Sequence, residues 1–446
     1  MTEELDIHSN NQKFTVLIIL AICLLALSAC LRSKETAQSS NNQDQVIARQ
    51  GTQVGNASEA FSASTKFRTI AFPDNVELGT ISIRTDPEKY HSLGMVTGPR
   101  RVPAHAFVRL ELIPGEYADL RKLGELKPDD IQELQAGRAL FRENDLKWIS
   151  HLSGLIRLDL SNTSVTDKGL AYLSELSSLR ALQLVNTNVQ GDGLSQLARC
   201  KKLEEIQLAG SKFNDQNASK LLSVKQIGWL FLYDTPVTDK ALPAIAQLTN
   251  LGLLDLGRTG ITGKGLRCLT PLHKLGTCVL EWTDVGDEDI PSILQIGRLQ
   301  ELSLTGTKIT NRALPLLAER NWRRLSFGSD DIDDSGVAQL SKIRSLVVLD
   351  LNKTKVDDKG LRSLQTLNNL QVLNLNDTRV TDAGLAQLVT LKQLKELELR
   401  ETTVTDEGLK YLQGLPLARV DLYGTRVSKA GLARFRASMP HTRIEY

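Results

Sequence analysis

Residues 155–176, LIRLDLSNTSVTDKGLAYLSEL, contain the pattern that decides the fold. The pattern reads L-x-x-L-x-L-x-x-T-x-V-T-D-x-G-L-x-x-L-x-x-L, and it returns from Leu370 and again from Leu394. Its threonine position recurs about every 24 residues in twelve units. Twelve copies in phase indicate an array of equivalent structural units rather than chance. These positions are Thr163, Thr187, Ser211, Thr235, Thr259, Thr283, Thr307, Asp330, Thr354, Thr378, Thr402 and Thr425.

Each unit predicts a short strand, a turn and a short helix. Leu158 and Leu160 alternate with polar residues, which is the two-residue period of a strand with one buried face. Leu170, Leu173 and Leu176 recur every three residues and share one face of a helix. Neither element buries its apolar side alone, so we expect neighbouring units to stack.

The T-D-x-G step recurs at the start of each predicted helix. We expect Asp167 to be the N-cap, accepting hydrogen bonds from free N–H groups of the first helical turn. Capping accounts for this aspartate column, so no catalytic role is assigned to it. Gly169 recurs although glycine inside a helix costs about 0.5–1 kcal/mol relative to alanine. Its recurrence predicts a close backbone approach between units.

These motifs resemble those of bacterial leucine-rich-repeat proteins of the T-D-x-G-L type, whose repeats have a similar period. The resemblance covers residues 155–446, and more weakly 131–152. It implies an α/β fold: a curved solenoid with a parallel sheet on the concave face and short helices on the convex face. It also implies binding rather than catalysis, and it does not name a partner.

Residues 14–29, FTVLIILAICLLALSA, form an apolar run that ends before Cys30. The sequence from Leu27 to Cys30 resembles the lipobox of bacterial lipoproteins, so we expect residues 1–29 to be a signal peptide and Cys30 to be lipidated. The alternative is an uncleaved membrane anchor, although the run is short for a spanning helix. Both interpretations predict a membrane-anchored, extracytoplasmic protein of the cell envelope. Residues 30–66 are rich in polar residues and predict a disordered tether.

Between the tether and the clear repeats lie two further segments. Residues 67–115 contain the predicted strands 78–84 and 105–113, and we expect a small β-rich N-terminal cap that covers the open edge of the first repeat. Residues 116–154 are transitional and predict a degenerate repeat, because their apolar residues precede those of the first unit by 24. Residues 155–446 form the repeat domain. At its end, Ile444 and Tyr446 predict a last half-strand.

The composition points away from several classes of function. The formal net charge is +2, and no basic stripe with interleaved aromatic residues predicts a nucleic-acid partner. The sequence has no nucleophile elbow, P-loop or zinc-binding helix motif, so we assign no catalytic residue, no metal ligand and no cofactor. The acidic segment from Asp330 to Asp334 lacks the spacing of a calcium loop, and a solvated loop with one capping aspartate is the preferred interpretation.

The repeat register predicts an aromatic patch on the concave face. Leu230 and Leu232 align with the buried leucines, so Trp229, Phe231 and Tyr233 must point to the opposite face of their strand. Because aromatic side chains are scarce on solvated sheets, this clustering predicts a binding site. The alternative is that these side chains shield one another, or that a loop covers them. The predicted binding residues, which we call the aromatic patch, are Trp229, Phe231, Tyr233, Leu253, Val279 and Trp282.

A second set of outward residues near the C-terminus is charged, and a solvated surface is the preferred interpretation for it. Its members are Glu396, Glu398, Arg400, Arg419, Asp421 and Tyr423.

The sequence therefore predicts a membrane-tethered binding scaffold whose concave face recognises a protein, with a glycan as the second choice. Two rival hypotheses remain. In the first, the protein is a structural envelope component that self-associates through the same surface. In the second, the solenoid recruits substrate for a catalytic segment. That segment would have to lie in residues 67–115, which are short and carry no convergent acid–base set.

Overall fold

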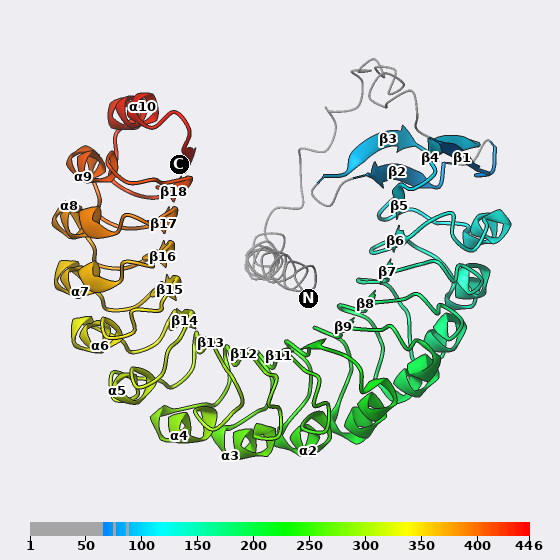
Figure 1. Cartoon of the computed structure of the whole chain (residues 1–446), viewed down its shortest axis with the longest axis horizontal. Coiled ribbons are helices and arrows are strands. Elements are labelled where there is room, and N and C mark those ends of the chain that lie inside the picture. The colour runs from blue at the N-terminus through cyan, green and yellow to red at the C-terminus, as the bar shows by residue number, and fades with distance from the viewer. Residues whose placement is uncertain (1–65, 75–76, 86–88) are drawn as a thin grey trace, which may run out of the picture. The chain divides into compact units, whose positions relative to one another are not determined.

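The computed structural model describes residues 66–74, 77–85 and 89–446, which lie within one compact unit, residues 62–446. Within this unit the repeats stack into an open arc. Short strands line the inner edge of the arc and helices line the outer edge (Figure 1). The predictions for residues 1–29 and for the tether up to residue 65, including the lipidation of Cys30, lie outside the described residues. Within the described part, no helix is long and apolar enough to cross a membrane.

The strands of the described part are mostly three residues long in the repeats and longer near the N-terminus. They are β1 (Phe67–Ile70), β2 (Gly79–Arg84), β3 (His91–Met95), β4 (Arg100–Pro103), β5 (Phe107–Leu112), β6 (Glu133–Gln135), β7 (Arg157–Asp159), β8 (Ala181–Gln183), β9 (Glu205–Gln207), β10 (Trp229–Phe231), β11 (Leu253–Asp255), β12 (Thr277–Val279), β13 (Glu301–Ser303), β14 (Arg324–Ser326), β15 (Val348–Asp350), β16 (Val372–Asn374), β17 (Glu396–Glu398), β18 (Arg419–Asp421) and β19 (Arg443–Glu445).

The convex face carries 3-10 helices in the first repeats and more α-helix towards the C-terminus. The 3-10 helices are η2 (Leu120–Glu125), η3 (Glu143–Ile149), η4 (Gly169–Leu173), η5 (Asp192–Arg199), η6 (Asp215–Val224), η7 (Asp239–Ala241), η8 (Arg267–Leu269), η9 (Asp287–Asp289), η10 (Leu364–Thr366) and η11 (Ala386–Thr390). The α-helices are α2 (Leu242–Ile245), α3 (Gly263–Leu266), α4 (Ile290–Ile293), α5 (Leu314–Leu317), α6 (Asp334–Leu340), α7 (Asp358–Ser363), α8 (Asp382–Leu385), α9 (Asp406–Leu412) and α10 (Lys429–Ser438).

One curved sheet runs through the arc. From β5 to β19 each strand pairs in parallel with the next, in a register that sets equivalent repeat positions side by side. The predicted inward leucines, such as Leu158, Leu160, Leu230 and Leu232, are buried. The solenoid core and its register are therefore confirmed.

The two ends of the repeat array join the same sheet. β2 and β5 fall within the segments predicted as strands, and they pair with each other in antiparallel fashion. β5 also pairs with β6 of the degenerate repeat, so the N-terminal strands extend the repeat sheet. At the other end, β19 pairs with β18 as the predicted last half-strand.

The recurrent threonine closes the turn that follows each strand. In the first unit the Thr163 hydroxyl donates to the Leu160 carbonyl over 2.6 Å, and Thr378 does the same with Leu375. The residue before this threonine has a positive φ, as at Asn162 with 58°. The turn thus satisfies a backbone carbonyl where the chain leaves the strand.

The aspartate of the T-D-x-G step does not cap its own helix, so that prediction is wrong. The preceding threonine is the cap: Thr381 accepts a hydrogen bond from the Ala383 N–H. The carboxylate of Asp358 instead reaches one repeat ahead. It accepts the Thr381 N–H over 2.8 Å and the Thr381 hydroxyl over 2.7 Å. The aspartate column is therefore a ladder that joins neighbouring repeats through charge-assisted hydrogen bonds.

The glycine of the same step provides the space that this ladder needs. A Cβ added at Gly384 would lie 2.4 Å from Asp358 Oδ1, and one added at Gly408 would lie 2.3 Å from Asp382 Oδ1. Neighbouring repeats do approach closely here, but the prediction of a backbone approach is wrong at Gly384 and Gly408, where the approaching group is a carboxylate. In the degenerate repeat Glu143 replaces the aspartate, and its Oε1 accepts the N–H groups of Thr166 and Gly169.

The eighth unit is one residue short, yet the sheet register continues through it, because Glu301 pairs with Arg324. Asp330 takes the position of the turn threonine and is only 5% exposed. Its Oδ1 accepts the Thr307 N–H over 2.8 Å, while its Oδ2 is buried without a hydrogen-bond partner. The predicted solvated loop is thus wrong for Asp330 itself, which lies inside the solenoid.

Candidate functional site

The concave face is built from the outward residues of the short strands. In β10, Trp229 lies between Glu205 of β9 and Leu253 of β11. Phe231 lies in the next position, between Gln207 and Asp255. The register therefore places Trp229, Phe231, Leu253 and Val279 at outward positions of adjoining strands, whereas Tyr233 and Trp282 lie past the strand ends. Val279 continues the row of Phe231 and Asp255 through its pairing with Asp255.

Exposure differs within the aromatic patch. Trp229, Tyr233 and Val279 are half-buried, and Trp282, just past the end of β12, is 51% exposed. Phe231 and Leu253 are only 8% and 4% exposed. For these two the expectation of an open surface is wrong, because strands about 4.8 Å apart bring the side chains of neighbouring repeats into contact. These two side chains are therefore buried, as the alternative of a covered patch expects, while the other four residues are at least partly exposed.

Two glycines determine how the exposed rings lie. A Cβ added at Gly257 would lie 2.6 Å from Cδ2 of Tyr233, so the tyrosine ring lies over the following repeat. A Cβ added at Gly306 would lie 2.4 Å from Cε3 of Trp282, so the tryptophan covers the next turn in the same way. Each ring therefore packs against a glycine of the next repeat, at a position where a side chain would not fit.

Carboxylates lie among these rings, and the sequence analysis missed them. Asp255 accepts the Gly257 N–H over 2.9 Å, and Glu281 accepts the Ser303 hydroxyl over 2.6 Å. Burial raises the pKa of Asp255 to about 7 and also raises the pKa of Glu281. An alignment of each repeat with the next would have shown these two acids at outward positions. Asp255 lies 24 residues after Phe231, and Glu281 lies 24 residues after Gly257. We call these two residues the acidic pair.

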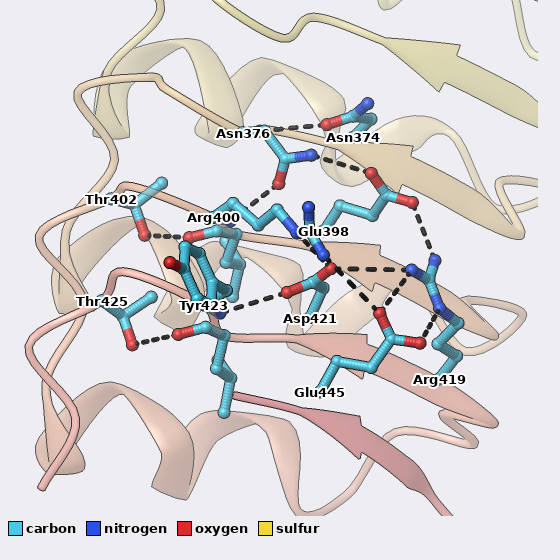
Figure 2. A network of polar contacts seen from close by, with 12 residues as sticks. Asn374, Asn376, Glu398, Arg400, Thr402, Arg419, Asp421, Tyr423, Thr425 and Glu445 are labelled. Carbon is cyan, nitrogen blue, oxygen red and sulfur yellow. Dashed lines mark hydrogen bonds and ion pairs between the residues drawn. The ribbon is translucent and has the colours of Figure 1, made fainter. Parts of the chain in front are cut away.

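The charged set near the C-terminus forms a closed polar network, shown in Figure 2. The Arg419 guanidinium contacts Glu398 over 2.8 Å, Glu445 over 3.0 Å and Asp421 over 3.6 Å. Its hydrogen bond lowers the pKa of Glu445. Arg400 pairs with Asp421, which is buried. The arginines are thus held by acids of the same surface.

Tyr423 is the exposed ring of that network. It is 58% exposed, and the Arg400 guanidinium carbon lies 5.6 Å from its ring centroid. Glu396 lies one strand away from Arg419 in the sheet register. This surface is more polar than the aromatic patch.

The comparisons with known proteins agree with the repeat architecture. The family described as "Leucine Rich repeat" matches residues 342–364, 366–389 and 392–412. No curated protein sequence matches the chain. The stacked strand–turn–helix units and these matches define the class: the described residues form a leucine-rich-repeat solenoid.

Solved structures with similar folds come from several organisms. An internalin from Listeria monocytogenes is 20% identical, with a TM-score of 0.42, and the match covers 76% of this chain and 86% of that one. A leucine-rich-repeat protein from Leptospira interrogans is 19% identical, with a TM-score of 0.46, and the match covers 76% and 81%. The ectodomain of a plant membrane receptor kinase from Arabidopsis thaliana, in complex with CASPARIAN STRIP INTEGRITY FACTOR 2, is 15% identical, with a TM-score of 0.40. That match covers 76% of this chain and 50% of the other.

Proposed function

We propose that this protein is a membrane-tethered, extracytoplasmic scaffold that binds a protein partner on its concave face. The observation that carries the proposal is the gathering of three aromatic side chains on the inner side of the solenoid, with Trp282 exposed and Trp229 and Tyr233 half-buried. Aromatic side chains of this kind are enriched among the residues that dominate protein interfaces.

The concave face has the physical properties of a preorganised interface. The cross-repeat hydrogen bonds and the buried leucines fix the backbone beneath the rings, so little conformational entropy is lost when a partner binds. Phe231 and Leu253 add an apolar floor between the half-exposed rings. The plant receptor ectodomain named above was solved with a partner, which supports partner binding as a use of this fold.

The proposed tether and location rest on the sequence outside the described residues. The apolar run 14–29 and the lipobox-like sequence that ends at Cys30 support attachment of the protein to a membrane. The polar composition of residues 30–66 supports a spacer between that attachment and the repeats. Both features support exposure of the solenoid on the outer side of the cytoplasmic membrane.

A capture experiment tests the proposed function. Purified protein is immobilised, exposed to an envelope extract, and compared with the double variant Trp229→Ala/Tyr233→Ala. The matched control is Trp148→Ala/Tyr411→Ala, which removes the same residue types from helices η3 and α9 on the convex face (Figure 1). Circular dichroism first establishes that each variant is folded.

We expect the concave variant to lose the captured protein and the convex control to retain it. Each aromatic anchor contributes over about 2 kcal/mol, or roughly thirtyfold in affinity. Equal capture by all three proteins would refute the concave aromatic patch as the site. Light scattering distinguishes the rival function, because a stable oligomer that dissociates in the concave variant would favour self-association.

A further inference from the structure

The sheet of the arc ends in two strands with different outer edges. At one end, β3 pairs with β2 through an irregular register, with a shift between Ile81 and Ser82 and a φ of 83° at Gly94. Irregularities of this kind keep a sheet from pairing further. At the other end, β19 pairs with β18 in an unbroken register, and no strand of the described residues pairs with its outer edge. The tip of the arc at β19 therefore presents a regular strand edge (Figure 1).

The outer edge of β19 carries one backbone donor and one backbone acceptor. The Arg443 N–H donates to the Ala418 carbonyl over 2.8 Å. The Glu445 carbonyl accepts the Leu422 N–H over 2.8 Å. Both residues thus direct backbone groups towards β18. Because these groups alternate in direction along a strand, the N–H and the carbonyl of Ile444 point to the outer edge.

The side chain of Ile444 is less covered than its equivalents in the array. The same position in the two preceding strands holds Val420 and Leu397, which are 0% exposed, whereas Ile444 is half-buried. The difference arises because a neighbouring strand covers Ile444 on one side only. A strand added at the outer edge would bury this apolar side chain as the array buries the others.

The charges beside Ile444 select a strand of the same sequence that runs in the opposite direction. In an antiparallel pair centred on Ile444, Arg443 of each copy lies opposite Glu445 of the other, and opposite charges across a sheet are stabilising. A parallel copy would instead set like charges opposite one another. The same centring lets the two copies of Ile444 exchange both of their outward hydrogen bonds.

Both charged side chains are placed for such a contact. The Arg443 side chain is 76% exposed, and the Glu445 side chain is 25% exposed. Glu445 contacts Arg419 over 3.0 Å, and Arg419 lies on the β18 side of it (Figure 2). A second copy would approach Glu445 from the opposite side, so it leaves the contact with Arg419 in place.

We propose that β19 pairs with β19 of a second copy of this chain, antiparallel and centred on Ile444, so that two arcs join end to end across a twofold axis. This interface goes beyond the function proposed above, because it uses the end of the sheet and leaves the concave aromatic patch outside the contact. The contact is small, which predicts a weak and reversible dimer. Confinement of both copies by a membrane tether would raise their effective concentration and favour it.

Light scattering of the purified full-length protein in detergent tests the dimer over a concentration series. Absorbance and refractive-index detection separate the protein mass from the detergent mass. The variants Arg443→Glu and Glu445→Arg each set like charges opposite one another in the dimer, whereas their equimolar mixture restores two opposite-charge pairs. The matched controls are Arg362→Glu and Glu319→Arg, which reverse exposed charges elsewhere in the repeats.

A second pair of variants tests the backbone contact without a change of charge. Ile444→Pro removes the outward N–H, and an edge strand tolerates proline where its N–H faces solvent. Ile444→Val keeps the N–H and the β-branched shape. Circular dichroism and thermal melts first establish which variants are folded, and the mixing experiment decides if Ile444→Pro is not.

We expect the unmodified protein to approach twice the monomer mass as its concentration rises. Each charge variant alone should dimerise at least about tenfold more weakly, and their mixture should return to within about twofold of the unmodified protein. The matched controls, alone or mixed, should show no change. Ile444→Pro should stay monomeric, whereas Ile444→Val should remain within about twofold.

A protein that stays monomeric throughout the series would overturn the proposal. A dimer that Ile444→Pro and both charge variants leave unchanged would do the same, as would charge variants that do not associate when mixed. Dimerisation that is lost in Trp229→Ala/Tyr233→Ala but kept in Ile444→Pro would also overturn it and move the contact to the concave face. The capture experiment is independent of these results, because its readout depends on the concave residues.

Discussion

Asp330→Thr should stabilise the protein, and the gain should increase with pH. Asp330 occupies the turn position where other repeats carry a threonine whose hydroxyl donates to a strand carbonyl. Its carboxyl is 5% exposed, and its Oδ2 has no hydrogen-bond partner. Burial raises the pKa of Asp330 to about 8, while an unfolded aspartate has a pKa of about 3.9.

The sign of the pH effect follows from proton binding. Between about pH 4 and about pH 8 the folded chain holds a proton on Asp330 that the unfolded chain releases, so stability falls as the pH rises through this window. One pH unit corresponds to about 1.4 kcal/mol per proton. The stability difference between Asp330→Thr and the unmodified protein should therefore grow by roughly 3 kcal/mol from about pH 5 to about pH 7. It should level off above about pH 8.

Urea denaturation followed by circular dichroism measures this difference at about pH 5, 6, 7 and 8.5. Other titrating groups, such as Asp255 and Asp350, are present in both proteins, so their effects cancel in the comparison. Asp330→Asn keeps the shape of the side chain and removes only its titration. It should show the same pH slope relative to the unmodified protein. Parallel pH profiles for all three proteins would refute the assignment of a buried, proton-binding Asp330.

Three further predictions concern the repeats and the N-terminus. Leu373→Ala should cost about 2–5 kcal/mol of stability, whereas Asn374→Ala on the opposite face should cost about 1 kcal/mol or less; equal shifts in urea midpoint would contradict the register. Gly408→Ala should destabilise by about 1–3 kcal/mol because its new Cβ meets the Asp382 carboxylate, while Gly414→Ala, with nothing within 4 Å, should be neutral or stabilising in the same thermal melts. Mass spectrometry of the membrane-bound protein should find an acylated Cys30 at its N-terminus, and an intact Met1 terminus would exclude cleavage there.

The solenoid could be predicted because the sequence carries two periods. One is the two-residue alternation within a strand, and the other is the 24-residue recurrence between repeats. The alternation around Leu158 determines which side chains face inward, and the 24-residue recurrence determines which strands adjoin. Both are geometric consequences of a pleated strand repeated in register. The one-residue deletion before Asp330 leaves the sheet pairing unchanged, so it did not disturb the prediction.

The errors arose where contacts between repeats decide the outcome. Asp167 was predicted to serve its own helix, but its carboxylate accepts the N–H groups of Gln190, Gly191 and Gly193 one repeat ahead. Phe231 was predicted to be open because strand alternation determines the face, whereas exposure depends on side chains that the adjoining repeats contribute. Comparing each residue with those 24 positions away would have identified the acidic pair and the ladder.

The energetics of the two concave surfaces favour the aromatic patch as the binding site. A partner that binds the C-terminal network must compete with ion pairs that already satisfy Arg419, Asp421 and Glu445, and the desolvation of those groups offsets much of the gain. At the aromatic patch the partly exposed rings of Trp229 and Trp282 lose unfavourable contact with water when a partner covers them. Covering the C-terminal network with a partner therefore has a high energetic cost, whereas covering the aromatic patch has a net benefit. The same buried charges that hold the C-terminal network together make it a weak interface, so a partner should bind the arc at β10 to β12 first.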